Sequence, residues 1–384
     1  MSAGPAPRPR QATGPGLPAP AGVPVPARIR VLVVDDSSVI RRLVTDALSE
    51  DPAIEIVGQA PDGRVALERI ATLRPDAVTM DIEMPVMNGI EAVRALRRTD
   101  PRLPVVMFST LTERGASATL DALAAGASDY VTKPSNVDSF AESRRNVREQ
   151  LVPKLKALAA ARRARAAVRA VPAPAPARPA RSVRTGPFGL LVIGCSTGGP
   201  DALATVLPQL PADLPVPVLV VQHMPPVFTR LLAQRLDGQS PLSVAEAAAG
   251  ERVVPGRVLI APGGFHLVVR RSGMGLVTEL TEDPPENFCR PAVDVLFRSA
   301  AASGERVLAA VLTGMGRDGE RGARLVREAG GEVFAQDDVT SVVWGMPGAV
   351  VGAGQADRVL PLPEVGAELA RALGRAPALG AVRS

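Results

Sequence analysis

The 384-residue sequence is poor in cysteine, histidine and aromatic side chains. It contains two cysteines, two histidines, one tryptophan and one tyrosine, and only 3% of its residues are aromatic. Two isolated thiols cannot build a disulfide framework. No hydrophobic run reaches the length of a membrane span, and residues 1–27 lack the continuous apolar segment of a secretory signal. We therefore expect a cytoplasmic protein without disulfides that does not insert into a membrane.

Basic charge is concentrated between the two halves of the chain. Residues 151–187 carry nine lysine or arginine side chains and no acidic one, whereas residues 28–150 and 188–384 are each mildly acidic. Proteins that bind nucleic acids usually place positive charge on a folded face. A basic strip within a linker therefore favours a solvated tether, and we expect no nucleic-acid binding.

Short apolar runs alternate with helical patterns in the first half of the chain. Strands are expected at 30–34, 54–58, 76–80, 105–108 and 129–132, separated by helices at 37–49, 63–72, 88–98 and 115–125. This alternation predicts a flavodoxin-like, five-stranded parallel sheet. A long helical stretch is expected from Asp138 to about Ala170, with a kink or break at Pro153. Residues 171–187 are rich in proline and alanine and predict an extended tether.

The second half predicts another doubly wound, mainly parallel α/β domain. Strands are expected at 190–194, 216–222, 257–261, 266–270, 307–313, 332–336 and 358–362. Helices are expected near 200–207, 226–236, 291–302, 317–329 and 363–373. The predicted organisation is a disordered tail (1–27), a first domain (28–150), a helical and then proline-rich linker (151–187), a second domain (188–376) and a short tail (377–384).

Polar side chains follow the expected strands of the first domain. They are Asp35 and Asp36, Asp81, Ser109 and Thr110, and Lys133. Because the carboxyl ends of parallel strands meet at one edge of a sheet, these groups are expected to converge. Three carboxylates repel one another unless a cation screens them, and hard oxygen ligands suit Mg²⁺. Asp81 could then attack phosphorus, with the metal and Lys133 balancing the phosphoryl charge.

The second domain carries a serine on a glycine-flanked turn. Ser196 follows the apolar run 190–194, and the glycines permit a sharp turn that exposes its hydroxyl. His223 ends a second strand-like run, and Asp318 lies beyond a third. These three groups could meet in one cleft as nucleophile, base and orienting acid. The backbone N–H groups that could hold an oxyanion are those at Thr197 and Met315.

Other assignments in the second domain compete with this one. His266 begins a strand, which points it away from the cleft and makes it the weaker base. Cys195 precedes the exposed turn position and is expected to point into the core. Residues 314–319 match the G-x-G-x-x-G fingerprint of dinucleotide binding, and Asp337 falls at a suitable spacing. Against nucleotide binding, Asp318 would place a carboxylate where a pyrophosphate should lie.

Residues 28–146 resemble the receiver domain of two-component response regulators, through DDS, MDIEMP, FST and TKP. The resemblance implies that Asp81 accepts a phosphoryl group. It also implies that Mg²⁺ is bound by Asp36, Asp81, the backbone carbonyl of Glu83 and, through water, Asp35. The switch hydroxyl, the coupled aromatic side chain and the phosphate partner would be Ser109, Tyr130 and Lys133.

The motifs VIGCSTGGP, QHMP, APGGFH, LTGMGRDG and VVWGMPGAV follow this receiver-like region. Over about 28–376 the chain resembles the chemotaxis protein-glutamate methylesterase/glutamine deamidase (CheB) family. The resemblance implies a triad of Ser196, His223 and Asp318, with Thr197 and Met315 lining the oxyanion site. It implies hydrolysis of γ-glutamyl methyl esters on chemoreceptors, deamidation of receptor glutamines and phosphorylation by a histidine kinase. The ester step itself is expected to need no metal.

The resemblance further implies that the receiver shields the active site until it is phosphorylated. A long tether lowers the effective concentration of the receiver at that site by a modest power of its length, so inhibition is expected to be weaker here than is usual in the family. We expect a monomer. Two alternatives from other classes remain: a response regulator with a non-catalytic nucleotide- or nucleic-acid-binding module, and a general serine esterase that acts on small soluble esters.

Overall fold

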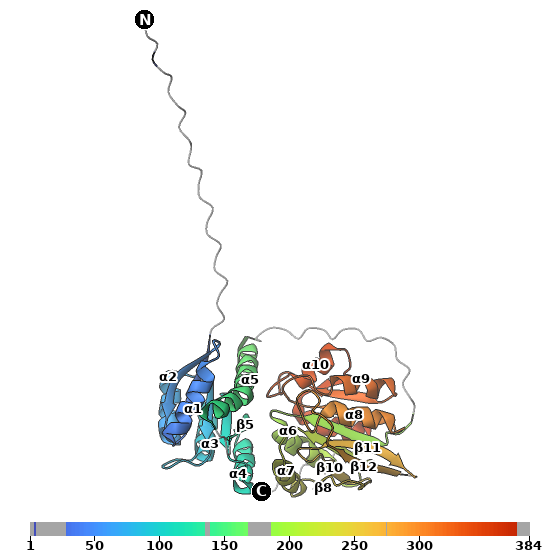
Figure 1. Ribbon diagram of the computed structural model, residues 1–384. Helices are drawn as coiled ribbons and strands as arrows, with labels where there is room; N and C mark the ends of the chain where they lie inside the picture. Colours follow the sequence, from blue (N-terminus) through green and yellow to red (C-terminus); the bar gives the residue numbers. More distant parts are fainter. Residues whose placement is uncertain (1–3, 5–27, 135–138, 168–185, 274, 375–384) are drawn as a thin grey trace.

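The computed structural model describes residues 4, 28–134, 139–167, 186–273 and 275–374. These residues form two α/β domains that lie side by side (Figure 1). The predicted tails, apart from residue 4, and the proline-rich part of the predicted linker lie outside the described residues. Within the described ranges, no helix combines the length and the hydropathy needed to cross a membrane.

The first domain is a parallel sheet with the strand order β2-β1-β3-β4-β5, which confirms the flavodoxin-like prediction. Its strands are β1 (Ile29–Val34), β2 (Ile54–Ala60), β3 (Ala77–Asp81), β4 (Val105–Ser109) and β5 (Asp129–Thr132). The connecting helices are α1 (Ser38–Ser49), α2 (Gly63–Leu73), α3 (Gly89–Thr99) and α4 (Glu113–Ala124). Strands β3 and β4 are buried throughout. Apolar side chains fill them because helices cover both faces of a parallel sheet.

Helix α5 (Phe140–Ala167) is built onto the first domain. It runs through Pro153 without a break, and its buried leucines, such as Leu151 and Leu155, pack in the core of that domain. Four basic side chains that the sequence assigned to a solvated linker pair with carboxylates of the first domain: Lys154 with Asp129, Lys156 with Asp51, Arg162 with Asp100 and Arg163 with Asp76. The predicted boundary at residue 150 falls inside this helix, because its apolar face is buried on both sides of that point.

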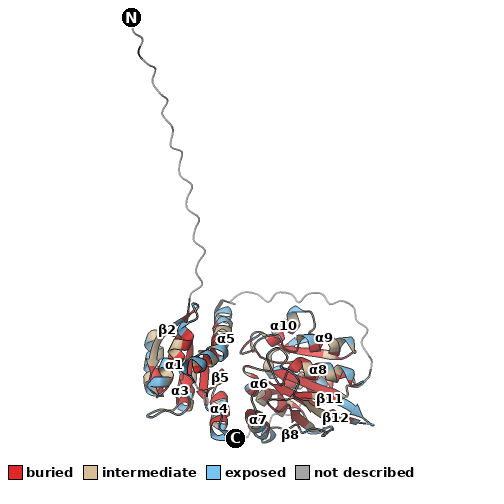
Figure 2. Ribbon diagram, viewed as in Figure 1, coloured by how far each residue is buried: buried red, intermediate tan, exposed pale blue. Residues whose placement is uncertain are grey.

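The second domain contains a parallel sheet with the strand order β15-β14-β13-β6-β7-β10-β8, as the predicted doubly wound fold requires. The strands are β6 (Leu190–Cys195), β7 (Val218–Gln222), β8 (Ser243–Glu246), β10 (Arg257–Ile260), β13 (Val307–Val311), β14 (Glu332–Gln336) and β15 (Arg358–Leu360). One face packs on α6 (Gly199–Val206), α7 (Phe228–Asp237) and α11 (Leu362–Ala372). The other packs on α8 (Val293–Ala302), α9 (Glu320–Glu328) and α10 (Met346–Gly352). Figure 2 shows the buried strands between these helices, whose outer faces are exposed.

Several elements of the second domain had no prediction. They are β8, β9 (Arg252–Val253), β12 (Gly275–Thr281), α10 and a short 3₁₀ turn, Leu207–Gln209. Strand β11 (His266–Ser272), which was predicted, pairs with β12 in a separate antiparallel sheet of order β11-β12-β9. Strands β8 and β9 are too short to give a periodic signal, and half of β12 is polar, so periodicity alone does not reveal them.

The two domains touch through α4 on one side and α6 and α7 on the other. The ring of Tyr130 stacks on that of Phe228, with centroids 4.7 Å apart and planes 11° from parallel. One buried apolar cluster continues from the core of the first domain to the α6–α7 face of the second. Exposed ion pairs flank this contact, Glu113 with Arg230 and Asp121 with Arg235. The contact therefore joins an apolar centre to a charged rim.

Candidate functional site

Three adjacent parallel strands bring side chains to one edge of the second sheet. Ser196 directly follows β6, His223 directly follows β7, and Asp318 lies in the loop between β13 and α9. The three strands are neighbours in the order β13-β6-β7. Strands β7 and β13 lie on opposite sides of β6, so the site is at a topological switch point, where open α/β sheets bind ligands.

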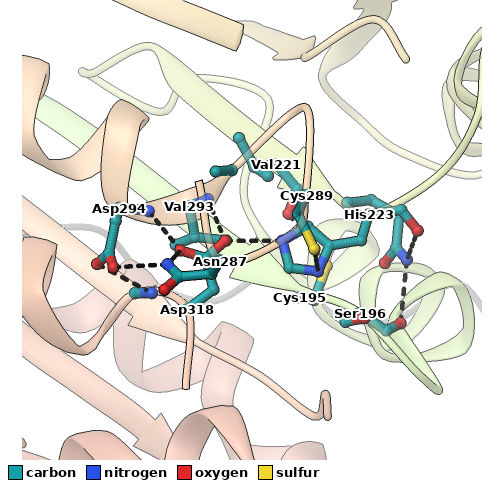
Figure 3. Close-up of polar contacts among 12 residues, drawn as sticks. Cys195, Ser196, Val221, His223, Asn287, Cys289, Val293, Asp294 and Asp318 are labelled. Carbon is teal, nitrogen blue, oxygen red and sulfur yellow. Dashed lines mark hydrogen bonds and ion pairs between the residues drawn. The ribbon is translucent and has the colours of Figure 1, made fainter. Parts of the chain in front are cut away.

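His223 and Asp318 form a direct hydrogen bond. The imidazole Nε2 lies 2.8 Å from Asp318 Oδ2 (Figure 3). Burial disfavours the imidazolium, but the hydrogen bond with Asp318 and the neighbouring Cys289 outweigh it and raise the pKa of His223 to about 9. Burial also raises the pKa of Asp318, yet His223 and two backbone N–H groups hold it below its ordinary value. These interactions would stabilise the imidazolium that forms when the neutral ring accepts a proton.

Ser196 lies beside this pair without a side-chain hydrogen bond to it in the described part of the chain. The second ring nitrogen of His223, Nδ1, lies 3.5 Å from Cys289 Sγ instead. Ser196 and His223 nevertheless line one cavity, together with Thr197. Contacts between nucleophile and base are often loose before substrate binds. The structure thus joins two of the three predicted triad residues directly and brings the third into the same cavity.

Two glycines allow the backbone to pack closely around Ser196. Gly198, which precedes α6, has a φ of 77° in the left-handed region. A Cβ on Gly314 would lie only 2.9 Å from Ser196 Cβ. The loop after β13 therefore approaches the serine because residue 314 has no side chain. Met315, predicted to supply an oxyanion N–H group, follows directly in this loop.

The residues weighed as alternatives have structural contacts. His266 is buried, and its two ring nitrogens lie 3.2 Å from the carbonyl oxygen of Pro284 and 3.2 Å from the backbone nitrogen of Ala292. Cys195 is fully buried, and burial raises the pKa of its thiol, which suppresses the reactive thiolate. Asp337 accepts a hydrogen bond from the backbone of Thr340 at 2.9 Å.

Three residues around the His223–Asp318 pair had no recognised signal in the sequence: Asn287, Cys289 and Asp294. Asn287 Nδ2 donates to Asp318 Oδ1 at 2.8 Å, and the backbone nitrogen of Asp294 donates to the same oxygen at 2.9 Å. Asp294 is an acidic residue in the first turn of a predicted helix, which is the one sequence feature that could have drawn attention to it.

The acidic residues of the first domain gather beyond its strands. Asp35, Asp36 and Asp81 each place a carboxylate oxygen within 4.8 Å of the others. Lys133 Nζ lies 2.8 Å from Asp81 Oδ1 and 3.0 Å from Asp35 Oδ2. Burial raises the pKa of Asp81 to about 6 despite the hydrogen bond from Lys133. Three clustered carboxylates are the donor set that a hard divalent cation prefers.

The other predicted receiver residues have contacts outside this cluster. The buried Ser109 hydroxyl donates to the Gly115 carbonyl at 3.1 Å and accepts from Thr119 Oγ1 at 2.6 Å. Tyr130 lies on the neighbouring strand β5 and contacts the second domain. Glu83 pairs through its side chain with Arg114, and the hydroxyl of Thr110 lies 3.2 Å from that of Thr112.

The first domain closes over Ser196. Its residues Leu123, Asp129, Tyr130 and Lys154 line the cavity that holds Ser196 and His223. That cavity offers only about 20 Å³, enough for about one water molecule. Thr197 Oγ1 donates to Asp129 Oδ2 at 2.5 Å, and Lys154 Nζ donates to the same oxygen at 2.6 Å. A cavity of this size is too small for the side chain of a modified glutamate.

The fold and the two sites define a response regulator whose second domain is an α/β hydrolytic enzyme. Residues 31–144 match the family model of the response regulator receiver domain, and residues 191–369 match that of the CheB methylesterase. A protein-glutamate methylesterase/protein-glutamine glutaminase from a Nocardioides species is 60% identical over 356 residues, covering 90% of this chain and 96% of that protein. The chain belongs to the CheB methylesterase family, which confirms the resemblance found in the sequence.

Two further proteins are similar to this chain. A protein-glutamate methylesterase/protein-glutamine glutaminase from Trichodesmium erythraeum is 45% identical over 350 residues, covering 90% of this chain and 99% of that protein. The crystal structure of the Thermotoga maritima CheB methylesterase catalytic domain is 46% identical, covers 47% of this chain and 97% of that chain, and has a TM-score of 0.47.

Proposed function

We propose that this enzyme hydrolyses the γ-methyl esters of glutamates on chemoreceptors, releases methanol and deamidates receptor glutamines, and so serves chemotactic adaptation. The observation that carries the proposal is the placement of Ser196, His223 and Asp318 after three adjacent strands, with the hydrogen bond of 2.8 Å between the last two. The names of the relatives supply the substrate class. The family resemblance implies that these esters lie on the cytoplasmic part of the receptors, and we place the enzyme in the cytoplasm.

In the proposed reaction, Ser196 Oγ attacks the side-chain carbonyl of the modified glutamate. His223 takes the proton on Nδ1, because Nε2 is held by Asp318, and Cys289 must then yield its place beside Nδ1. His223 next protonates the leaving methoxy oxygen or amide nitrogen, so that methanol or ammonia departs. Water, which gives a proton to His223, then cleaves the acyl-enzyme, and the proton returns to Ser196 Oγ. Asp318 stabilises the imidazolium, and backbone N–H groups at Thr197 and Met315 would hold the oxyanion.

We further propose that a histidine kinase supplies a phosphoryl group to Asp81. Asp35, Asp36 and Asp81, together with the carbonyl of Glu83, would hold Mg²⁺. Their carboxylate oxygens, within 4.8 Å of one another, fit that hard cation. The bound ion would screen the negative charge of the carboxylates and the phosphoryl group. Lys133, 2.8 Å from Asp81, would pair with the phosphoryl oxygens.

The contact between the domains supports control by phosphorylation. Ser109 and Tyr130 lie on neighbouring strands, β4 and β5, and Tyr130 stacks on Phe228 of the second domain. We propose that Ser109 moves toward the phosphoryl group and that Tyr130 follows, which weakens the stacking. The first domain would then leave the cavity around Ser196 and admit the receptor.

Methanol release from radiolabelled methylated receptors tests this function. An acyl phosphate with Mg²⁺ should accelerate release by the full chain about 5- to 150-fold, the usual range of an allosteric coupling. Asp81→Asn should remove the acceleration, since an amide cannot accept the phosphoryl group. Equal rates on receptors and on small soluble esters would instead indicate a general esterase. Tight nucleotide retention without methanol release would favour a non-catalytic module.

The hydrogen bond from Thr197 to Asp129 should help to hold the domains together. Asp129→Ala removes this bond between the domains, together with the bond from Lys154 within the first domain, and a bond to a charged group contributes about 1.5–3 kcal/mol. Methanol release without phosphoryl donor should therefore rise about tenfold. Asp121→Ala, which breaks an exposed ion pair of the same contact, should have little effect. If Asp129→Ala also left the basal rate unchanged, the bond from Thr197 would not hold the closed arrangement.

A further inference from the structure

Two buried carboxylates, Asp318 and Asp294, each accept hydrogen bonds from the start of a helix. Asp318 binds the start of α8, which carries Asp294, and Asp294 binds the start of α9, which follows Asp318. Asp318, which precedes α9, accepts from the backbone nitrogens of Val293 at 2.6 Å and Asp294 at 2.9 Å, in the first turn of α8. Asp294 in turn accepts from the backbone nitrogens of Gly319 at 3.0 Å and Gly322 at 2.7 Å, at the start of α9. Figure 3 shows this exchange next to His223.

Neither helix has a capping side chain of its own. The residues at the N-cap positions are Ala292 for α8 and Gly319 for α9, and neither makes a side-chain cap. Their free N–H groups are therefore satisfied by the opposite helix, whose carboxylate also interacts favourably with the helix dipole. Helices usually begin with a capping side chain at the N-cap position. This sequence has none at the start of either helix and buries two acidic side chains there. Such departures concentrate at functional sites.

Asn287 links the two carboxylates. Its Nδ2 donates to Asp318 Oδ1 at 2.8 Å and to Asp294 Oδ2 at 3.0 Å. Asn287 and Phe288 have φ values of 52° and 64°, and backbone hydrogen bonds between Glu286 and Cys289 close the tight turn around them. The same turn therefore holds the acid of the triad through Asn287 and contacts the imidazole through Cys289.

We propose that Asp294 and Asn287 are positioning residues that fix the carboxylate of Asp318 for catalysis. Asp318 Oδ1 is occupied by Asn287 and the Asp294 backbone, so Oδ2 is the oxygen that faces His223 Nε2. Rotating the carboxylate would break these bonds together. Asp294 is 1% exposed, which leaves solvent little room to replace them. The inference rests on the proposed function, because these residues act only through Asp318 and His223.

Kinetics of the full chain with an acyl phosphate test this role. Asp294→Ala should lower kcat about 100-fold with KM within about twofold, since a misplaced group costs turnover and leaves binding intact. Asp294→Asn keeps an oxygen for Gly319 and Gly322 and should recover most of the loss. Asn287→Ala should lower kcat about tenfold. The matched control is Asp357→Ala, which removes the acceptor for the Val333 backbone at the amino end of β14 and an ion pair with Arg327. It should leave kcat unchanged, because the proposed triad lies at the carboxyl ends of the strands.

A double variant separates positioning from general instability. If Asp294 acts through Asp318, adding Asp294→Ala to Asp318→Asn should lower kcat by less than about threefold more, because residues acting as a unit are not additive. Folded Asp294→Ala and Asn287→Ala proteins with wild-type kcat, or a full additional 100-fold loss in the double variant, would overturn the inference. If Asp294→Ala does not fold, the kcat values of Asn287→Ala and Asp294→Asn test the inference in its place. Failure of the unaltered enzyme to release methanol would instead overturn the proposed function.

Discussion

Replacing Ser196 with alanine is expected to lower kcat for methyl ester hydrolysis by about 10⁴-fold or more, the scale at which serine enzymes lose their nucleophile. Ser196 directly follows β6 and lines one cavity with His223 and Thr197. Removing Oγ leaves the base and the oxyanion donors without an attacking group. Methanol release at saturating receptor, with an acyl phosphate present, measures the loss.

Two controls make this result specific. Ser243→Ala removes an exposed hydroxyl of the same domain and should leave turnover unchanged. Cys195→Ala removes a thiol that is buried in the core next to Ser196. It should lower the free energy of unfolding without lowering kcat. The account would be contradicted if Ser196→Ala kept full activity and a folded Cys195→Ala protein were inactive. Cys195 would then be the nucleophile.

Replacing Asp318 with asparagine is expected to lower kcat by about 10⁴-fold, as in other triads where the amide selects the wrong imidazole tautomer. In this enzyme the substitution should also lower the stability of the fold. Both oxygens of Asp318 accept hydrogen bonds: Oδ1 from Asn287 and the Asp294 backbone, Oδ2 from His223 and the Val293 backbone. An amide nitrogen at either position therefore meets N–H donors, and the buried groups left unpaired should cost about 1–3 kcal/mol of stability.

The Asp318→Asn prediction requires both kinetics and thermal unfolding. KM for methylated receptor should stay near its original value, since Asp318 is buried away from the substrate side of His223. Asp337→Asn is a suitable control, because Asp337 caps a neighbouring turn through Thr340 and touches none of the triad. A folded Asp318→Asn enzyme within tenfold of the original kcat would show that another group orients His223.

The positions of the triad residues followed from the sequence because each comes after a strand of one parallel sheet. Ser196, His223 and Asp318 had to reach the same edge once β6, β7 and β13 were recognised. The residues that hold Asp318 could not be found in this way. Asn287 and Cys289 lie in a tight turn between the small antiparallel sheet and α8, and their contacts depend on how that turn packs against Asp318 and His223.

The relation between the domains was also beyond the sequence. Thr197 and Asp129 are 68 positions apart, and their hydrogen bond depends on how two separately folded sheets dock. The basic residues of α5 were misassigned for a related reason. Composition marked Lys154 and Arg162 as linker charge, whereas the acids that pair with them are supplied by β5 and by the end of α3.

The rate at which a fluorophosphonate labels the full chain tests the central claim most directly, with the labelled residue identified by peptide mass spectrometry. The account predicts a single modified side chain, Ser196, slow labelling in the enzyme alone and labelling about tenfold faster after addition of an acyl phosphate with Mg²⁺. Asp81→Asn should stay slow under both conditions. Labelling at another residue, or an equal rate with and without the phosphoryl donor in the unaltered enzyme, would contradict it.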